Sequence, residues 1–570
     1  MQFSDYLKSY RQCIKEMPQK KIQVAFLSMF TIKGLKEVLT VKAFKEGIGI
    51  DCYEGAYRQV IQEALGWNEQ FVIPDITFLL WDAESLLGDY YIDAYKYTVS
   101  ERRNYIEDKW KEFRQYVNLL EQNIPGILVI HNFAYPAFSP LGIMETKQEF
   151  GLMESIEYLN HSLAEYCRDK TSVYIFDYAG FQSRFGAAAL KDNKMYYLGD
   201  MKLSMDGLIL LADGYLSFIR ALAGKSRKCL VLDLDNTLWG GIVGEDGIDH
   251  IKLGLDYEGK AYREFQIYIK SLLHRGVILA VNSKNNYEDA MEVIENHNYM
   301  VLQKQDFAAF KINWQDKVSN MKELAEELNI GLDSMVFIDD DEVNCEMMRT
   351  NLPMVKTIHL NGNPVTYVDE IKRLTDFNTL SFTEEDRKKN EQYRTQILRN
   401  ELKSNTATLE EFILSLNIQT RFEQLNDSNI GRISQLTMKT NQFNLTTRRY
   451  TESDLETLKS SGYEIVCIHV SDRFGDNGIC GVLIYKLEKQ ELFIDTMLLS
   501  CRVMGRKIED KYFEFLEEAA EKEQAAAITG EYIPTLKNKP VEGLYQEKGF
   551  VCILQDENRQ MWRKNRKGKE

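Results

Sequence analysis

The stretch that decides the fold is Lys228-Cys-Leu-Val-Leu-Asp-Leu-Asp-Asn-Thr-Leu-Trp-Gly-Gly241, near the middle of a chain of 570 residues. Residues 229–232 form an apolar run without helical periodicity, which is typical of a strand buried on both faces in a parallel sheet. The run ends at Asp233 and Asp235, and Thr237 follows two residues later. Ligands of open α/β sheets bind just beyond the carboxyl ends of strands, where two neighbouring carboxylates need a compensating charge. The stretch therefore predicts a site for a divalent cation at the end of this strand.

Two more apolar runs, at residues 277–281 and 335–338, also end in polar side chains. Along the chain, the polar residues that follow these runs or lie between them are Asn282, Ser283, Lys317, Asp339 and Asp340. Together with Asp-x-Asp-x-Thr, this order resembles the four motifs of the haloacid dehalogenase (HAD) phosphotransferase superfamily. We therefore expect residues 223–378 to form a HAD-like domain with a Rossmann-like parallel sheet.

The HAD resemblance implies a catalytic role for four side chains. Asp233 would attack phosphorus and form an aspartyl-phosphate. Asp235 would protonate the leaving oxygen and then accept a proton from the attacking water. Ser283 would hydrogen-bond a phosphoryl oxygen, and Lys317 would neutralise phosphate charge. This set predicts phosphoryl transfer through a covalent enzyme intermediate.

The same resemblance implies a Mg²⁺ site. Its ligands would be the Asp233 carboxylate, the main-chain carbonyl of Asp235 and an acid of the pair Asp339 and Asp340. We favour Asp339 as the direct ligand because it follows its strand immediately, with Asp340 as the alternative. The residues expected to contact the substrate beside them are Thr237 and Asn282.

The spacing of the motifs leaves no room for the large mobile cap of many HAD phosphatases. Only 46 positions separate Thr237 from Ser283, and 34 separate Ser283 from Lys317. We expect an open site, which suits a substrate carried on a protein or on a long flexible arm. The alternative is that neighbouring domains serve as the lid.

Composition sets limits on the class of protein. A length of 570 residues predicts three or four domains, and 44% hydrophobic with 27% charged residues is ordinary for a soluble globular protein. A net charge of −16 without a basic stripe argues against a nucleic-acid partner. No apolar stretch reaches the roughly 20 residues of a membrane helix, and the start of the chain does not resemble a signal peptide. Nine scattered cysteines suggest reduced thiols, so we expect a cytoplasmic protein.

Residues 1–222 are expected to form an α/β domain of flavodoxin-like type. Strand-like runs at residues 23–27, 73–80, 127–130 and 173–176 alternate with helical patterns, and their order resembles the SGNH-hydrolase fold. Ser28 lies near the position of the nucleophile of that family, and Asn132 lies near the oxyanion-stabilising residue. Residues 199–205 contain no histidine that could act as the general base. We therefore expect a non-hydrolytic role, such as docking, substrate shaping or dimer contact.

The last part of the chain is expected to hold a charged helical connector at residues 379–405 and an α+β domain at residues 406–570. A strand at residues 493–499 is followed by Arg502-x-x-Gly505-Arg506 and a helix, whose free N–H groups could bind a pyrophosphate. This resembles the acyl-CoA loop of GNAT acyltransferases, and residues 545–550 resemble the late GNAT segment. The alternative is a GNAT-like fold that only positions a carrier protein or the HAD site.

Nearly the whole chain resembles the FkbH-like proteins of HAD subfamily IIIC. The motifs that carry this resemblance are Leu-Asp-Leu-Asp-Asn-Thr-Leu-Trp-Gly-Gly, Thr-Asn-Gln-Phe-Asn-Leu-Thr and Ser-Cys-Arg-Val-x-Gly-Arg. The resemblance implies a glyceryl transferase/phosphatase of the kind found in polyketide biosynthesis. Such an enzyme takes 1,3-bisphosphoglycerate, removes phosphate, and loads the glyceryl unit as a thioester on an acyl carrier protein with a phosphopantetheine arm.

One position departs from the relatives that form an enzyme-bound thioester. They often have Cys-Ser-Lys-Asn where this chain has Asn282-Ser-Lys-Asn285, and an amide cannot form a thioester. Either Cys501 serves as the thiol, or the carrier thiol attacks the acyl phosphate directly, or the protein is only a phosphatase. Cys501 could equally be a small packing residue.

Two other functions therefore stay open beside the carrier-linked transferase. One is a stand-alone Mg²⁺-dependent phosphatase acting on a metabolite of polysaccharide or secondary-metabolite biosynthesis. The other is a GNAT-type acyltransferase whose HAD domain is regulatory.

Overall fold

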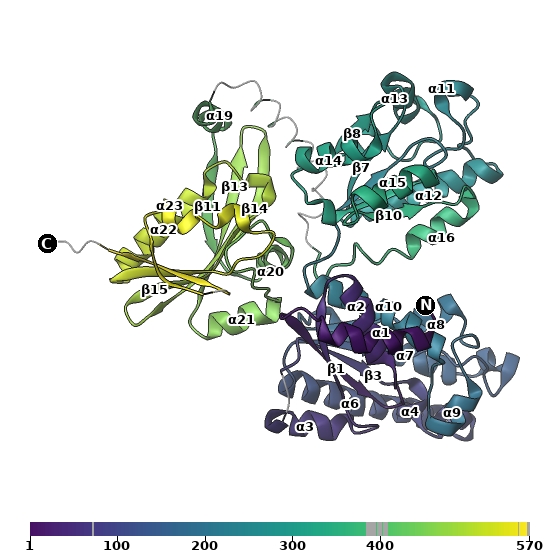
Figure 1. The fold of residues 1–570 in the computed structure, drawn as a ribbon. Helices are drawn as coiled ribbons and strands as arrows, with labels where there is room; N and C mark the ends of the chain where they lie inside the picture. The colour runs from purple at the N-terminus through teal and green to yellow at the C-terminus, as the bar shows by residue number, and fades with distance from the viewer. Residues whose placement is uncertain are drawn as a thin grey trace. The chain divides into compact units, whose positions relative to one another are not determined.

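The computed structural model describes residues 1–70, 73–382, 408–556 and 558–566, together with residues 395, 399 and 402. The connector expected at residues 379–405 lies almost wholly outside these residues. The chain divides into two compact units, Met1–Ala223 and Gly224–Glu570. The first unit contains one parallel sheet, and the second contains a parallel sheet and a mixed sheet (Figure 1). None of the described helices combines the length and the apolar character needed to cross a membrane.

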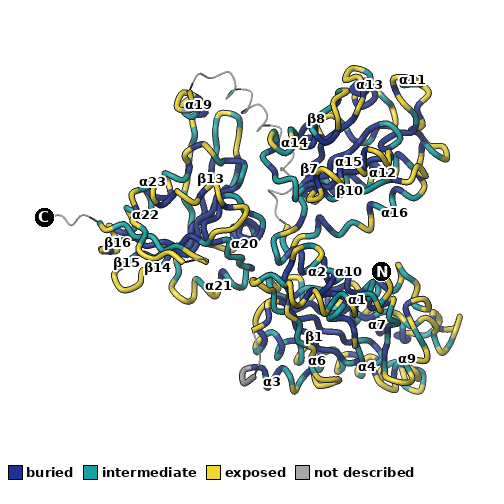
Figure 2. The backbone as a smooth tube through the Cα atoms, viewed as in Figure 1, coloured by how far each residue is buried: buried dark blue, intermediate teal, exposed yellow. Residues whose placement is uncertain are grey.

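The first unit is a five-stranded parallel sheet in the order β2-β1-β3-β4-β5. Its strands are β1 Lys21–Ser28, β2 Gly49–Glu54, β3 Ile76–Leu80, β4 Ile127–His131 and β5 Val173–Phe176. The runs expected as strands are confirmed, whereas β2 is not predicted by its sequence because this edge strand is largely polar and exposed beyond Ile50. Figure 2 shows the other strands as the buried centre of the unit.

Helices cover both faces of this sheet. The main ones are α1 Phe3–Lys15, α2 Leu35–Lys45, α3 Val60–Gln70, α6 Val99–Asn123, α7 Leu152–Arg168 and α10 Met205–Leu222. Helices α1, α2 and α10 pack together, and α3 and α7 both pack against α6. Shorter helices are α4 Ala83–Leu87, α5 Tyr90–Asp93, α8 Tyr178–Phe185 and α9 Asn193–Gly199. The unit is therefore a three-layer α/β fold, as expected.

A neutral histidine is buried at the end of β4. His131 is 1% exposed, and its Nε2 lies 2.5 Å from the Tyr215 hydroxyl of α10. Its ring stacks on Tyr178 at a centroid distance of 4.7 Å. Burial lowers the pKa of His131 to about 3. The folded first unit therefore excludes a proton that the unfolded chain binds near pH 6.5.

This histidine is expected to make the first unit acid-sensitive. Because the folded pKa lies below the unfolded one, stability is full above pH 6.5 and falls progressively toward pH 3. The free energy of unfolding of the wild type should fall when the pH is lowered from 7.5 to 5. In His131→Phe this fall should be smaller by about 2 kcal/mol. Urea unfolding of the full chain at both pH values measures this, with the exposed His161→Phe as the control. An unchanged pH dependence in His131→Phe would contradict the assignment.

The second unit begins with a central domain built on a five-stranded parallel sheet in the order β10-β9-β6-β7-β8. The strands are β6 Cys229–Leu232, β7 Ile278–Ser283, β8 Ala309–Ile312, β9 Met335–Asp339 and β10 Lys356–His359. Leu230 and Leu232 belong to the hydrophobic core on one side of the sheet, and Cys229 and Val231 to the core on the other. The prediction that β6 is buried on both faces is therefore confirmed.

Helices α12 Tyr257–His274, α13 Tyr287–Asn296, α14 Lys317–Glu327, α15 Glu342–Asn351 and α16 Tyr367–Lys372 surround this sheet. All residues between β6 and β7 are described, and their helices are only α12 and the one-turn α11 Val243–Asp246. This connection therefore holds no inserted cap domain.

The C-terminal domain is a mixed sheet in the order β11-β13-β14-β15-β16-β18-β17, with β12 paired to β15. The strands are β11 Gln419–Gln424, β12 Phe443–Asn444, β13 Glu464–Asp472, β14 Gly475–Glu488, β15 Glu491–Leu499, β16 Ala527–Tyr532, β17 Val551–Gln555 and β18 Gln560–Asn565. The helices are α19 Leu409–Leu416, α20 Ile430–Lys439, α21 Glu452–Ser460, α22 Ile508–Lys522 and α23 Leu544–Glu547. Its order matches the GNAT-like fold expected for this part of the chain.

Strands β15 and β16 are parallel and pair only as far as Ile494 and Gly530. Beyond that point, a short segment of the same domain lies between them. Residues of β12 pair with the end of β15, the Leu445 N–H donates to the Met497 carbonyl at 3.1 Å, and the Ile533 N–H donates to the Leu445 carbonyl at 2.9 Å. Residues 443–445 therefore form main-chain hydrogen bonds in the gap where β15 and β16 no longer pair with each other.

Candidate active site

Three carboxylates converge at the carboxyl end of the central sheet. Leu232 of β6 lies opposite Ile338 of β9, so Asp233 and Asp339 emerge from neighbouring strand ends. The Asp233 N–H donates to the Ile338 carbonyl at 3.1 Å, which fixes the backbone there. Each of Asp233, Asp339 and Asp340 places a carboxylate oxygen within 4.8 Å of the others. The convergence expected from the strand ends is therefore present.

Lys317 lies among these acids. Its Nζ is 2.8 Å from Asp233 Oδ1 and 2.6 Å from Asp339 Oδ2, and its side chain is 5% exposed. Burial opposes the charge of this lysine, but the two carboxylates outweigh that effect and raise its pKa. The lysine is the first residue of α14, and the Asn282 amide of β7 donates to its main-chain carbonyl at 2.8 Å. This contact ties the start of the helix to the sheet.

One lysine does not balance the negative charge of the cluster. Burial and the Asp233 charge raise the pKa of Asp339 to about 6 and that of Asp340 to about 7. Such shifts mean that the protein alone stabilises the ionised carboxylates poorly. Three oxygen donors with a surplus of negative charge are the donor set that Mg²⁺ prefers. The residues present therefore fit a Mg²⁺ ion.

Three hydrogen bonds orient the Asp235 carboxylate beside the cluster. Its Oδ1 accepts from Trp239 Nε1 at 2.8 Å and from the Val243 N–H at 3.2 Å, and its Oδ2 accepts from Asn285 Nδ2 at 2.8 Å. Burial raises its pKa to about 6. An oriented carboxyl group with such a pKa can give and accept a proton near neutral pH. The Asp235 side chain is thus suited to proton transfer. Because both of its carboxylate oxygens accept hydrogen bonds, the main-chain carbonyl is the group of Asp235 that would bind the metal.

Three further expected residues lie at the same edge of the sheet. Ser283 is the last residue of β7, which pairs with β6, and it is buried. Thr237 is fully buried, and its hydroxyl has no hydrogen-bond partner among the described residues. Asn282 is also fully buried, and its amide is engaged with Lys317. Asn282 therefore positions Lys317. Its side chain has no exposed surface through which it could make the expected contact with the substrate.

Sequence reasoning alone does not single out Trp239 and Asn285, the side-chain partners of Asp235. Both lie close to motif residues, Trp239 two positions after Thr237 and Asn285 two positions after Ser283. Both residues follow the ends of adjacent parallel strands, and this is the feature of the sequence that could have pointed to them. Their pairing with one carboxylate depends on the three-dimensional path of two loops.

Comparisons with known proteins agree with this architecture. The family described as "FkbH, N-terminal domain" matches residues 23–220. One solved structure is the N-terminal part of the protein BF1531 from Bacteroides fragilis, which contains a phosphatase domain and is complexed with Mg. It is 30% identical, with a TM-score of 0.61, and the match covers 67% of this chain and 100% of that one. The chain belongs to the FkbH family. A comparison with curated proteins found no match.

Two acetyltransferase structures also match this FkbH-family chain over about a quarter of its length. The ribosomal-protein-S18-alanine N-acetyltransferase from Escherichia coli is 11% identical, with 26% of this chain and 97% of that one covered and a TM-score of 0.22. The PaiA N-acetyltransferase from Thermoplasma acidophilum, in complex with coenzyme A, is 12% identical, with 26% and 99% covered and a TM-score of 0.21.

In this FkbH-family protein, both arginine side chains of the expected pyrophosphate loop are buried. Arg502 and Arg506 are 4% and 3% exposed, and Arg506 Nη1 lies 3.0 Å from Asp472 Oδ2. Asp472 also pairs with Arg399 at 2.8 Å. Gly505 has a positive φ of 72° and closes the turn before α22, which begins at Ile508. Burial and the Asp472 ion pair turn the Arg506 side chain inward. Binding of a pyrophosphate by the main-chain N–H groups of this turn stays a prediction.

In the SGNH-like unit, Ser28 and Asn132 are held by neighbouring main-chain groups and by the Asp177 side chain. Ser28 Oγ donates to the Phe30 carbonyl at 2.6 Å and accepts from the Phe30 N–H at 3.2 Å. The Asn132 amide donates to Asp177 Oδ1 at 2.8 Å and accepts from the Ala179 N–H at 2.8 Å. Lys202, in the segment where that family has its histidine, lies 2.5 Å from Glu84. The non-hydrolytic role expected of this unit stays a prediction.

Proposed function

We propose that this FkbH-family protein is a Mg²⁺-dependent phosphatase and glyceryl transferase that acts on 1,3-bisphosphoglycerate. The observation that carries the proposal is the convergence of Asp233, Asp339 and Asp340 on Lys317 at the end of β6. The similarity to BF1531, whose phosphatase domain was crystallised in complex with Mg, supports it. Phosphoryl transfer needs positioning and charge neutralisation, and this cluster offers both.

The phosphatase step uses two carboxylates in sequence. Asp233 attacks the phosphorus of the phosphomonoester, the P–O bond to the sugar-acid carbon skeleton breaks, and Asp235 gives its proton to the leaving oxygen. Asp235 then takes a proton from water, which attacks the aspartyl-phosphate and releases inorganic phosphate. Lys317 neutralises negative charge throughout, and Ser283 orients a phosphoryl oxygen. Mg²⁺, held by Asp233, Asp339, Asp340 and the Asp235 carbonyl, would supply electrostatic stabilisation of the phosphoryl charge.

The transfer step uses the other end of the substrate. 1,3-Bisphosphoglycerate carries an acyl phosphate as well as a phosphomonoester. A thiol attacks the acyl carbon, the C–S bond forms, the C–O bond to phosphate breaks, and the thiol proton leaves to solvent. Asn282 offers no thiol, and Cys501 belongs to the C-terminal domain rather than to the acid cluster. We therefore propose that the phosphopantetheine thiol of an acyl carrier protein attacks directly.

A stand-alone phosphatase is the second candidate. Cys345 Sγ lies 3.7 Å from the Asp339 carbonyl, but this thiol is fully buried and burial raises its pKa to about 12. It is therefore poorly suited to hold the acyl group, which favours this candidate. A CoA-dependent acyltransferase is disfavoured by the segment that lies between β15 and β16 and by the burial of Arg502 and Arg506.

The experiment that tests the proposal is incubation with 1,3-bisphosphoglycerate, Mg²⁺ and candidate carrier proteins. Phosphate is measured in solution and the carriers are weighed intact by mass spectrometry. We expect phosphate release and a carrier mass gain of one glyceryl unit. Phosphate release without any mass gain would leave only the stand-alone phosphatase. No phosphate release above the Asp233→Asn background would overturn both.

A further inference from the structure

The mouth of the acid cluster holds a lysine that the proposed reaction does not use. Lys284 directly follows Ser283, the last residue of β7, and it is exposed. Its neighbour Asn285 donates to the Asp235 carboxylate at 2.8 Å, so this turn of the chain lies against the reacting groups. Lys284 is therefore placed where a substrate enters the site.

The side chain of Lys284 reaches toward the strand end that carries Asp233. Its Nζ donates to Asn344 Oδ1 at 3.4 Å, and Asn344 belongs to α15, which follows β9. Strands β7 and β9 lie on either side of β6 in the sheet. At roughly 4.8 Å between neighbouring strands, the two flanking strands are about 10 Å apart, and the two side chains together bridge this gap. The ammonium group therefore lies near the carboxyl end of β6.

No acid in contact with Lys284 neutralises its charge. Asn344 is a neutral amide, and Lys284 forms no ion pair with any residue that the structure describes. Its charge acts at a distance on Asp316, the N-cap of α14, whose carboxylate accepts from the Ser319 N–H at 2.8 Å. The ammonium group of Lys284 is therefore available to a bound anion.

A substrate with two anionic ends needs a second cation at this site. Lys317 is engaged with Asp233 and Asp339, and it serves the phosphoryl group that reacts. When that group lies at Asp233, a second anionic group on a three-carbon skeleton lies a few bonds away, toward the mouth. The carboxylates of the cluster repel this group, and an ammonium group at the mouth offsets the repulsion. Lysine binds carboxylate and phosphate through charge-assisted hydrogen bonds.

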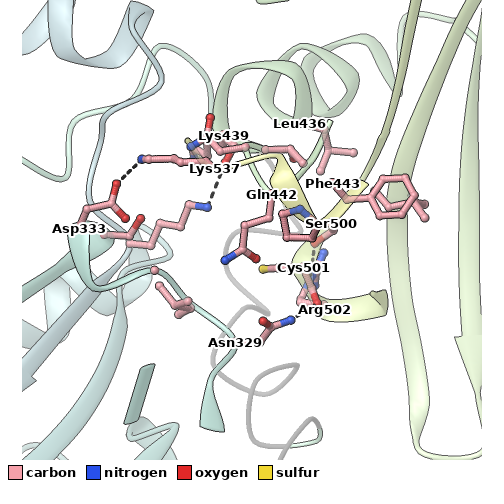
Figure 3. A pocket seen from close by; sticks show the side chains of 18 of the residues that line it. Asn329, Asp333, Leu436, Lys439, Gln442, Phe443, Ser500, Cys501, Arg502 and Lys537 are labelled. Carbon is pink, nitrogen blue, oxygen red and sulfur yellow. Dashed lines mark hydrogen bonds and ion pairs between the residues drawn. The ribbon is translucent and has the colours of Figure 1, made fainter. Parts of the chain in front are cut away.

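The pocket drawn in Figure 3 cannot take that second anionic group. It is lined in part by Lys228 and Ser334, which immediately precede β6 and β9. Asp233 and Asp339 lie at the opposite ends of the same strands. At roughly 3.3 Å per residue, the five steps from Lys228 to Asp233 span about 16 Å, which is too far for a three-carbon skeleton to join.

We propose that Lys284 is a specificity-determining residue, which binds the anionic group at the far end of the substrate while the phosphomonoester lies at Asp233. This inference rests on the proposed function and names the substrate class of the same site. The class is a phosphomonoester with a second anionic group at the other end of a short carbon skeleton. In 1,3-bisphosphoglycerate that group is the acyl phosphate, and an acyl end held at the mouth stays open to a carrier thiol.

The test compares two ligands that differ only at the far end. 3-Phosphoglycerate carries a carboxylate there, and glycerol 3-phosphate carries a hydroxymethyl group in its place. Isothermal titration calorimetry with full-length Asp233→Asn and Mg²⁺ measures both dissociation constants without consuming the ligand, because the nucleophile is absent. Adding Lys284→Met should raise the constant for 3-phosphoglycerate at least about tenfold and change that for glycerol 3-phosphate less than about twofold.

Three further variants in the same background separate recognition from structure. Lys284→Arg keeps the charge and should bind 3-phosphoglycerate within about threefold of the parent. Asn344→Asp keeps the lysine but gives it a carboxylate partner, so 3-phosphoglycerate should be weakened at least about threefold more than glycerol 3-phosphate. Lys260→Met removes an exposed lysine of α12 that pairs with Glu264 at 3.7 Å, and it should change neither constant.

Equal weakening of both ligands in Lys284→Met would overturn the inference, because the lysine would then act on the phosphate that they share. Unchanged binding of 3-phosphoglycerate in that variant would also overturn it, as would the absence of 3-phosphoglycerate binding to Asp233→Asn. Failure of the proposed function is read separately, as the absence of phosphate release from either compound by the wild type. A difference between the ligands that persists in that case would keep the binding role of Lys284 and remove the reaction.

Discussion

Asp233→Asn is expected to reduce phosphate release by at least about 10³-fold while the protein stays folded. The carboxylate oxygen is the atom that attacks phosphorus, and an amide is a far poorer nucleophile. The fold should survive because Lys317 keeps its contact with Asp339 at 2.6 Å, and because one of three mutually repelling acids becomes neutral. Steady-state phosphate release with Mg²⁺ and circular dichroism measure the two effects.

The matched control for this variant is Asp249→Asn, which makes the same change at an exposed position of the connection between β6 and α12. It should retain activity within about twofold. Phosphate release near the wild-type rate in Asp233→Asn would remove Asp233 from the role of nucleophile. A collapse of the fold in that variant would show that the carboxylate is needed for structure.

Lys317→Met is expected to abolish activity and to destabilise the metal-free central domain. Removing one partner of a buried ion pair costs about 3–5 kcal/mol, because the remaining charges are left uncompensated. Here three carboxylates would stay within 4.8 Å of one another without a cation. Chemical denaturation in EDTA should show this loss, and phosphate release should fall to background with Mg²⁺ present.

Mg²⁺ should recover part of the stability lost in Lys317→Met, because a divalent cation replaces the missing positive charge. The increase in thermal midpoint on adding Mg²⁺ should therefore be larger in this variant than in the wild type. Lys322→Met, an exposed change on the same helix α14, should behave like the wild type. Equal stability of Lys317→Met and Lys322→Met in EDTA would contradict the central place given to Lys317.

Much of the central sheet could be predicted because its inner strands are unambiguous. The segments at β6, β7 and β9 are continuous apolar runs, and burial on both faces leaves few other interpretations. The edge strands β8 and β10 were missed. Both are only four residues long, and β10 is half-buried throughout with a lysine and a histidine at its ends. Such a pattern does not differ from that of a loop.

The acid cluster could be anticipated because it depends on strand order alone. The partners of Asp235 could not, since Trp239 and Asn285 reach it through loops whose paths are set by packing. The same limit applies to the ion pair of Arg506. Its sequence context resembles a ligand loop, but its partner Asp472 ends a strand 34 positions earlier, and no local pattern reveals that pairing.

The lack of an inserted domain in the connection between β6 and β7 has a consequence for the lifetime of the proposed phosphorylated enzyme. Only α11 and α12 occupy it, so the central domain has no inserted cap of its own to exclude water once Asp233 is modified. Hydrolysis should then outrun passage of the phosphoryl group to another acceptor, and the covalent form should not accumulate. In the proposed reaction, access of water to this centre would therefore decide how the phosphoryl group is partitioned, and release of phosphate is the expected outcome.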